Sequence, residues 1–258
     1  MDLGIAGLRT IVTAGAGGIG LEIARAFARE GARVEVCDVD EAALALLPQN
    51  DPSLTGTLCD VSDRASVQRF MDGALSRLGG LDVLVNNAGI AGPTGRVDQI
   101  DPADWDRTLA VDITGHFNVT RLAVPALKAS TNPSIIGISS AAGRFGFPLR
   151  TPYAAAKWGV VGFIKSLAME LGEFGIRANA ILPGSVDGPR IRSVFENKAR
   201  ERNVSMAEVQ ALALSATSLK CLIPPQHLAN MAVFLSSPMA ATISGQAIAV
   251  DGDMQMLV

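Results

Sequence analysis

The chain has 258 residues, which is long enough for one large α/β domain with a buried core. Its formal net charge of −3 argues against non-specific binding to nucleic acid or to an anionic membrane surface, and no apolar run reaches membrane-spanning length. The N-terminus shows no basic region followed by an apolar signal segment. Cys37, Cys59 and Cys221 lack metal-ligand spacing, so we expect reduced thiols, no metal site and a cytoplasmic protein.

Short apolar or β-branched runs alternate with longer helical patterns along the chain. The predicted strands cover residues 9–13, 33–37, 54–59, 81–85, 134–139, 177–182 and 247–250. The predicted helices cover residues 19–29, 41–47, 64–78, 102–128, 152–172 and 225–236. This alternation predicts a doubly wound (Rossmann) α/β fold of seven parallel strands with helices on both faces, and one domain over residues 1–258.

A glycine-rich turn follows the first predicted strand and leads into a helical pattern: Ala14-Gly15-Ala16-Gly17-Gly18-Ile19-Gly20. Glycines let the backbone turn tightly and approach a pyrophosphate, whose charge lies at the helix N-terminus. The second strand is followed by Asp38, about twenty residues after the glycines, where a carboxylate would bind the ribose hydroxyls of NAD. The pattern therefore predicts an NAD site, although Asp38 is also open to interpretation as a solvated loop carboxylate.

Tyr153 and Lys157 are four residues apart in a predicted helix, so they share one face. An ammonium one turn away stabilises a phenolate and brings a phenol toward acid–base work at neutral pH. Ser140, at the end of an apolar run, offers a hydroxyl that can polarise a substrate carbonyl. Ser139 is interpreted as structural, because consecutive strand residues point to opposite faces. The three residues Ser140, Tyr153 and Lys157 are the predicted catalytic set.

Residues 188–223 are inserted between the sixth strand and the last long helix, and we expect them to be a helical lid over the site. The pattern predicts two helices, residues 191–203 and 206–219. The insertion carries a basic cluster of Arg190, Arg192, Lys198, Arg200 and Arg202. A solvated helix face explains such a cluster, and attraction of an anionic substrate such as a carboxylate or sulfonate is the alternative.

These motifs together resemble the short-chain dehydrogenase/reductase family, over essentially the whole chain. Residues 13–20 are similar to the family's T-G-x-x-x-G-I-G cofactor loop, residues 86–89 match its N-N-A-G element, and Ser140, Tyr153 and Lys157 match its catalytic serine, tyrosine and lysine. Asp60-Val61 resembles the acidic pair that contacts the adenine, and Pro183-Gly184 resembles the turn against the nicotinamide. The resemblance implies that the cofactor contacts Thr13, Gly15, Gly17, Gly18, Ile19, Gly20, Asp38, Asp60, Val61, Asn87, Ala88, Gly89, Tyr153, Lys157, Pro183, Gly184 and Val186.

Three positions depart from the family pattern. Ala14 replaces the first glycine of the loop, which we expect to shift the turn slightly. Asp112 replaces the asparagine that completes the catalytic set by holding a water beside the lysine through its backbone carbonyl. Its carboxylate would favour the charged form of Lys157 if the two are close. Gly188 replaces a threonine that contacts the nicotinamide, which leaves the backbone amide of Val186 as a contact.

The resemblance implies hydride transfer between NAD and a secondary alcohol or ketone of sugar, polyol, cyclic or hydroxy-acid type. Tyr153 would exchange the substrate proton, Ser140 would hydrogen-bond the same oxygen, and Lys157 would hold the nicotinamide ribose. The alternative is a catalytically weak NAD-binding protein with a regulatory or scaffold role, which only Asp112 and Gly188 favour. Residues 254–258 form an apolar C-terminal tail. The resemblance implies that such a tail packs at a subunit interface, and therefore a homotetramer or homodimer.

Overall fold

The computed structural model describes residues 2–257, and its centre is one sheet of seven parallel strands in the order β3-β2-β1-β4-β5-β6-β7. The strands are β1 (Arg9–Thr13), β2 (Arg33–Asp38), β3 (Leu54–Leu58), β4 (Val83–Asn86), β5 (Ser134–Ile138), β6 (Arg177–Pro183) and β7 (Ala247–Val250). Strand order reverses between β1 and β4, and doubly wound sheets bind ligands at such a switch point. The predicted fold class is confirmed.

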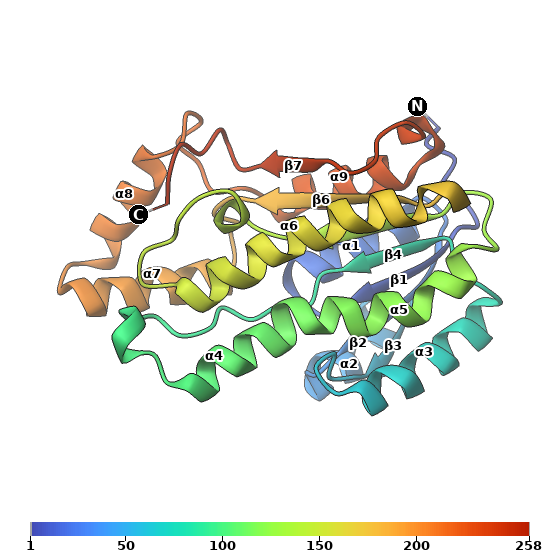
Figure 1. The fold of residues 1–258 in the computed structure, drawn as a ribbon, viewed down its shortest axis with the longest axis horizontal. Helices are drawn as coiled ribbons and strands as arrows, with labels where there is room; N and C mark the ends of the chain where they lie inside the picture. Colours follow the sequence, from blue (N-terminus) through green and yellow to red (C-terminus); the bar gives the residue numbers. More distant parts are fainter. Residues whose placement is uncertain (1, 258) are drawn as a thin grey trace.

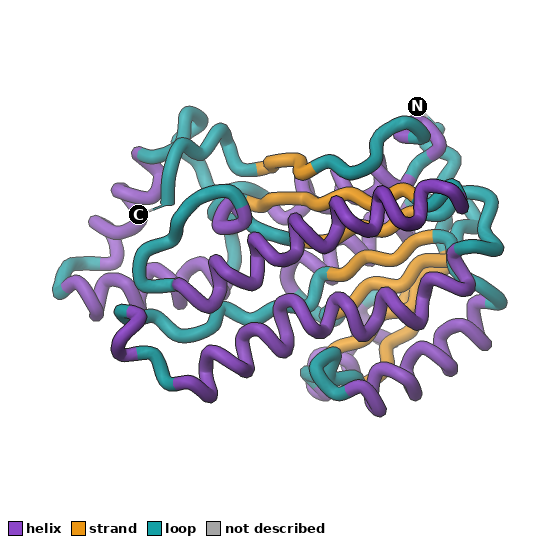
Figure 2. The backbone as a smooth tube through the Cα atoms, in the orientation of Figure 1, coloured by secondary structure: helices purple, strands orange, loops and turns teal. Residues whose placement is uncertain are grey.

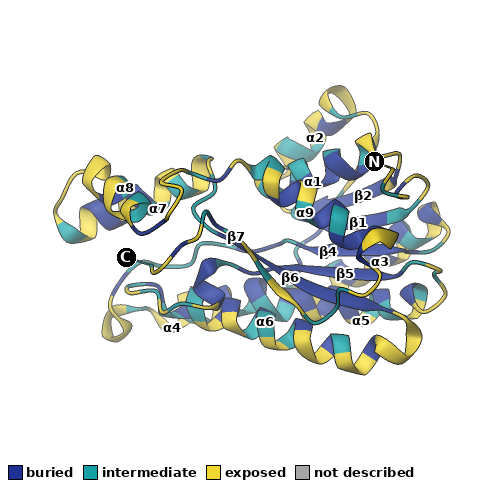
Figure 3. Ribbon diagram, turned by 90° about the horizontal axis from the view of Figure 1, so that it is seen from above, coloured by how far each residue is buried: buried dark blue, intermediate teal, exposed yellow. Residues whose placement is uncertain are grey.

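Helices cover both faces of the sheet, as Figure 3 shows from above. One face carries α1 (Gly18–Arg29), α2 (Glu41–Asn50) and α9 (Pro225–Ser236), whose apolar sides share a core with Val12 and Ile136. The opposite face carries α3 (Arg64–Leu78), α4 (Pro102–Leu109), α5 (Gly115–Leu127) and α6 (Thr151–Leu171). Its core includes Ile11 and Ile135, so neighbouring residues of one strand are buried on opposite sides of the sheet.

Residues next to the helices explain where several of them begin and end. The side chains of Asp63 and Asp101 accept hydrogen bonds from backbone N–H groups in the first turns of α3 and α4. Gly79 ends α3 in the left-handed conformation. The predicted bounds of α3 and α9 agree with the structure, and those of the other helices outside residues 102–128 and the lid differ from it by at most three residues.

The helix predicted over residues 102–128 is not continuous, and this is a correction. A π-helical segment, Ala110–Thr114, separates α4 from α5. Asp112 lies in that segment with its carboxylate buried and bound to the backbone N–H of Ile90. A wider helical turn of this kind is common at functional sites, and no hydrophobic periodicity reveals it.

The inserted segment forms α7 (Pro189–Arg202) and α8 (Met206–Ser215), which extend beyond the carboxyl ends of β6 and β7 (Figure 1). Ser205 and Glu208 start α8 with reciprocal side-chain to backbone hydrogen bonds. The predicted end at residue 219 is wrong, because α8 stops at Ser215 and Thr217 pairs with Met254. The tube in Figure 2 shows this helical pair set apart from the strands.

Among residues 2–257, the structure contains no helix with both the length and the apolar character needed to cross a bilayer.

Ala14 lies in the left-handed region, with φ of 50°, at the start of the glycine-rich turn. A Cβ in that region costs roughly 1–2 kcal/mol, whereas glycine adopts it freely at the expense of about 0.5–1 kcal/mol of unfolded-state entropy. We therefore expect Ala14→Gly to raise the free energy of unfolding by up to about 1 kcal/mol. Urea unfolding followed by circular dichroism measures this. Ala16→Gly, in the same turn without a positive φ, is the control and should not stabilise.

Candidate active site

The glycine-rich turn leaves room for a phosphate group at the N-terminus of α1. A Cβ added to Gly17 or Gly18 would meet nothing within 4 Å, and no side chain caps this helix end. Gly20 is needed for packing, because a Cβ there would lie 2.1 Å from the carbonyl oxygen of Ala14. The exposed N–H groups and the open space together fit a pyrophosphate.

Two residues of the predicted cofactor set brace this turn against the end of β4. The hydroxyl of Thr13 accepts hydrogen bonds from the backbone N–H groups of Asn87 and Ala88, both at 2.9 Å. The side-chain amide of Asn87 donates to the carbonyls of Thr13 and Ala14. The Thr13 hydroxyl and the Asn87 side-chain amide are thus used in hydrogen bonds within the protein. Both residues shape the cofactor site by holding β1 and β4 in register.

Acidic groups stand at the carboxyl ends of β2 and β3. Asp38 accepts hydrogen bonds from Ala16 N–H (3.0 Å) and Val39 N–H (2.8 Å), which fixes its carboxylate beside the glycine turn. Asp60 accepts from the N–H and hydroxyl of Ser62 and pairs with Arg107 at 3.3 Å. Burial pushes the pKa of Asp60 upward, but its Ser62 and Arg107 contacts outweigh burial and lower it. Val61 is buried beside it.

The most strongly constrained charges are Lys157 and Asp112, which are 3% and 0% exposed. Lys157 Nζ lies 3.6 Å from Asp112 Oδ2 and donates to the carbonyl of Ile138 at 3.2 Å. Burial raises the pKa of Asp112, while Lys157 and the N–H of Ile90 oppose that rise. Gly89 permits the pair, since a Cβ there would lie 3.0 Å from Lys157 Nζ. The structure therefore brings Lys157, Asp112 and Gly89 together.

Tyr153 lies at the start of α6, one turn before Lys157, whose Nζ is 5.5 Å from the centre of the phenol ring. Ser140 follows β5, and its Oγ accepts a hydrogen bond from Ala142 N–H. The neighbouring Ser139 is buried and donates to the carbonyl of Lys157 at 2.8 Å, so its structural interpretation fits this contact. The hydroxyl, phenol and ammonium thus come from β5 and α6, at the carboxyl edge of the sheet.

The turn after β6 carries the last predicted cofactor residues. Pro183 pairs with Val250 of β7, and a Cβ on Gly184 would lie 2.8 Å from Asp251. Val186 forms a bridge with Ile223, and the bridge hydrogen bonds use Ser185 O and Asp187 N–H.

The basic residues of the insertion do not form one continuous surface. Arg192 is exposed and pairs with Asp187, and Arg200 is exposed beside Asn197. Lys198 is buried, with its Nζ 4.1 Å from the centre of the Phe147 ring. Burial first, and then the charges of Arg202 and Arg150, lower the pKa of Lys198 to about 7.

Arg190 and Arg150 also reach the catalytic region. Arg190 donates to the carbonyl of Gly89 at 2.6 Å. Arg150 is 2% exposed, three residues before Tyr153, and its guanidinium carbon lies 5.2 Å from the centre of the Tyr153 ring. No sequence signal indicates Arg150, because a lone arginine in a turn belongs to no motif.

His116 is a core residue. It is 1% exposed and its Nε2 contacts the carbonyl of Ala88 at 3.2 Å. Burial, reinforced by the charge of Lys157, lowers the pKa of His116 to about 3. Among the described residues, no group of His, Cys, Asp and Glu could hold a metal ion.

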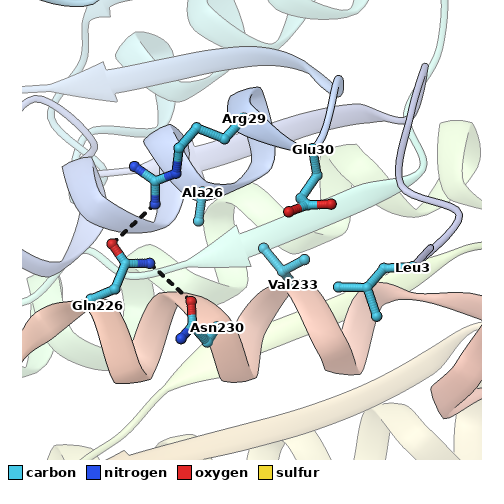
Figure 4. A pocket seen from close by; sticks show the side chains of 7 residues that line it. All are labelled: Leu3, Ala26, Arg29, Glu30, Gln226, Asn230 and Val233. Carbon is cyan, nitrogen blue, oxygen red and sulfur yellow. Dashed lines mark hydrogen bonds between the residues drawn. The ribbon is translucent and has the colours of Figure 1, made fainter. Parts of the chain in front are cut away.

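A groove between α1 and α9 lies on the other face of the sheet from Tyr153 (Figure 4). Arg29 donates to Gln226 and Gln226 donates to Asn230 along its floor, at 3.0 and 2.9 Å. None of the predicted site residues lines this groove, so it is separate from the catalytic region.

Comparison with known proteins shows to which family the chain belongs. The 3-oxoacyl-[acyl-carrier-protein] reductase of Thermotoga maritima is 35% identical over 248 residues, which cover 95% of this chain and 96% of that protein. The chain belongs to the short-chain dehydrogenase/reductase family. The family model described as enoyl-(acyl carrier protein) reductase matches residues 14–255.

Two further relatives show the range of this family. D-beta-hydroxybutyrate dehydrogenase of Cupriavidus necator is 34% identical over 251 residues, covering 95% of this chain and 97% of that enzyme. The crystal structure of an actinorhodin polyketide ketoreductase with NADPH has a TM-score of 0.90 at 33% identity, covering 95% of this chain and 96% of that one. The relatives thus act on hydroxyl or keto groups, and this chain is an oxidoreductase of the same family.

The low pKa of His116 predicts how stability depends on pH. The unfolded histidine takes up a proton below its ordinary pKa of 6.5, whereas the folded one does so only near 3. The stabilising contribution is therefore complete above pH 6.5 and is lost as pH falls toward 3, at up to about 1.4 kcal/mol per pH unit. His116→Gln keeps a donor for Ala88 but takes up no proton, so its unfolding free energy should fall less steeply.

Urea unfolding at several pH values between 6.5 and 4 measures this slope. His227→Gln is the matched control, because His227 is exposed. Equal slopes for the two variants would contradict the assignment of the acid sensitivity to His116.

Proposed function

We propose that this protein is an NAD-dependent oxidoreductase that moves hydride between nicotinamide and a secondary alcohol or ketone. The observation that carries the proposal is a buried ammonium, Lys157, held by Asp112 one helical turn from Tyr153. Burying charges of this kind costs stability, and proteins bury them where the chemistry of a site requires them. The open N-terminus of α1 and the fixed carboxylate of Asp38 support a dinucleotide beside them.

The cofactor, when bound, accepts or supplies the hydride. The pyrophosphate fits the backbone of Gly17, Gly18 and Ile19, with Gly15 and Gly20 allowing the close turn. In this proposal Asp38 binds the adenosine ribose, Asp60 and Val61 contact the adenine, and Ala88 and Gly89 line the cofactor. Pro183, Gly184 and the Val186 amide contact the nicotinamide.

Proton transfer in this proposal belongs to residues of the chain. In oxidation, the Tyr153 phenolate takes the alcohol proton while Ser140 donates a hydrogen bond to the same oxygen. Lys157 stabilises the phenolate, because its charge is close and poorly screened by water. Asp112 holds Lys157 in position through their ion pair, so we assign it a supporting role rather than contact with substrate.

The substrate class is a small alcohol or ketone of sugar, polyol, cyclic or hydroxy-acid type. Relatives named for hydroxybutyrate and for oxoacyl groups support chemistry at a hydroxyl or carbonyl group. A catalytically weak NAD-binding protein with a regulatory or scaffold role is the second candidate, and the departures at Asp112 and Gly188 favour it. The burial of Lys157 beside Asp112, one helical turn from Tyr153, weighs against that candidate.

We further propose that residues 188–223 act as a substrate lid and that the chain forms a homodimer or homotetramer. α7 and α8 lie at the carboxyl edge where substrate must enter (Figure 1). Phe117, Trp158 and Met169 are exposed on α5 and α6, which suits a face that a second copy covers. The free cysteines Cys37 and Cys59 suit a reducing compartment such as the cytoplasm.

Tyr153→Phe should remove nearly all turnover while NAD still binds. The ring keeps its edge contact with Phe147, but the group that exchanges the substrate proton is gone. Acid–base groups contribute about 10²–10⁴-fold in rate, so kcat should fall by at least about 10²-fold. Steady-state absorbance of reduced nicotinamide measures kcat, and fluorescence titration measures NAD binding.

Phe147→Leu is a useful comparison, because it removes the neighbouring ring and leaves the phenol. A Tyr153→Phe variant that binds NAD and keeps more than about a tenth of kcat would contradict the assignment.

NAD should be preferred over NADP because a 2′-phosphate would approach the Asp38 carboxylate. Such repulsion costs on the order of 1–3 kcal/mol, or several-fold to hundreds-fold in affinity. Asp38→Asn should narrow the gap in kcat/KM, since the amide oxygen can still accept from Ala16 N–H while the charge is lost. Asp40→Asn, two residues on at the cap of α2, is the matched control. Equal kcat/KM values for the two cofactors with the unchanged protein would contradict the claim.

A further inference from the structure

Arg150 is a buried cation that the mechanism above does not use. It is 2% exposed, and a guanidinium stays charged in proteins. Its Nη2 donates to the carbonyl of Ala91, but its Nε is buried without a hydrogen-bond partner. Among residues 2–257 no carboxylate forms an ion pair with it. Burial of an uncompensated charge costs several kcal/mol, so this arrangement is expected to meet an anion.

The position of Arg150 in the fold adds to this positive charge. It is the N-cap residue of α6, where Asp, Asn, Ser and Thr are preferred because the helix N-terminus is itself positive. The next residue, Thr151, also leaves its Oγ1 buried without a partner. The start of α6 therefore holds two unused donors within three residues of Tyr153.

Arg190 adds a second guanidinium to this part of the site, where it donates to the carbonyl of Gly89. The guanidinium carbon of Arg150 lies 5.3 Å from the centre of the Phe147 ring. Burial is the main cause that lowers the pKa of Arg150; the charges of Tyr153 and Asp112 oppose this, and the charge of Arg190 lowers the pKa further. The Asp112 carboxylate is itself bound to Lys157 and Ile90. Two guanidinium groups therefore lie in the catalytic region, and the Nε of Arg150 has no hydrogen-bond partner among the described residues.

We propose that the substrate of this site carries a carboxylate or sulfonate group that binds Arg150, with its reacting carbon at Tyr153. The inference rests on the proposed function and narrows its substrate class to small hydroxy acids or oxo acids. The oxyanion would accept hydrogen bonds from the unused donors at the start of α6 and balance the charge of Arg150.

The alternative role for Arg150 is that of a strap, a purely structural link between α6 and the segment after β4 that binds no substrate. Its bond to Ala91 and the bond from Gly95 N–H to Leu149 O join these two parts. A strap accounts for the Nη2 contact but does not explain why the Nε of Arg150 is buried without a hydrogen-bond partner. The two roles differ in a measurable way, because a strap has no preference for charged substrates.

Matched substrate pairs test the charge preference of the unchanged enzyme with NAD. We would compare kcat/KM for 3-hydroxybutyrate and 3-hydroxybutyramide, and for 4-hydroxycyclohexanecarboxylate and its carboxamide. A charged hydrogen bond is worth about 10- to 100-fold in affinity, so the carboxylate should be preferred by that factor in at least one pair. Equal values within both pairs would overturn the anion site and leave the proposed function standing.

Substitutions then assign the preference to Arg150. Arg150→Met should abolish it mainly through KM, Arg150→Lys should retain part of it, and Arg192→Met should leave it unchanged because Arg192 is exposed and paired with Asp187. A preference that survives in a folded Arg150→Met variant would overturn the proposal. If Arg150→Met does not fold, a full preference in Arg150→Lys counts against the proposal and a reduced one supports it.

A binding measurement separates the anion site from catalysis. Calorimetry of the NAD-saturated protein with butyrate and with propane-1-sulfonate reports anion binding without turnover and distinguishes the two anions. Binding of either one that is lost in Arg150→Met supports the site even if no alcohol is oxidised, in which case only the proposed function fails. Absence of binding for both anions, or binding that does not depend on Arg150, would overturn the site.

Discussion

The burial of Lys157 is the constraint on which the rest of the site depends. An ammonium that is 3% exposed has lost its hydration and must find oxygen atoms inside the protein. Three separate segments supply or permit them: the end of β5 through Ile138 O, the π-helical segment through Asp112, and the turn after β4 through the missing side chain of Gly89. Moving any of these elements would leave the charge uncompensated, so the sheet edge and the helix pair are held in one geometry.

The same constraint explains why a departure from the family pattern at residue 112 is compatible with an ordered site. An asparagine there would offer an oxygen to Ile90 N–H but no charge to Lys157. The aspartate does both, since its two oxygens serve different partners. The cost is a second buried charge, visible in the raised pKa of Asp112. Neither charge is stable alone in this interior, which couples the two residues energetically.

The strands, the glycine-rich turn and the shared helix face of Tyr153 and Lys157 were predictable because each has a short-range signature. Buried parallel strands are nearly continuous apolar runs, and the spacing of Tyr153 and Lys157 fixes their shared helix face whatever the rest of the chain does. The π-helical segment within residues 102–128 was not predictable, because a turn widened by one residue leaves the apolar periodicity almost intact. The end of α8 depends on the pairing of Thr217 with Met254, a contact between distant parts of the sequence.

The basic residues show most clearly that a sequence does not reveal which charged side chains the fold buries. Arg192, Lys198 and Arg200 look alike along the insertion, yet burial separates Lys198 from the other two by packing it on Phe147. Arg150 lies in a turn with no periodicity, and its importance comes from its burial and from the absence of an ion pair among the described residues. Motifs therefore locate the chemistry common to the family, whereas the electrostatic environment that selects a substrate arises from which ordinary residues the fold removes from water.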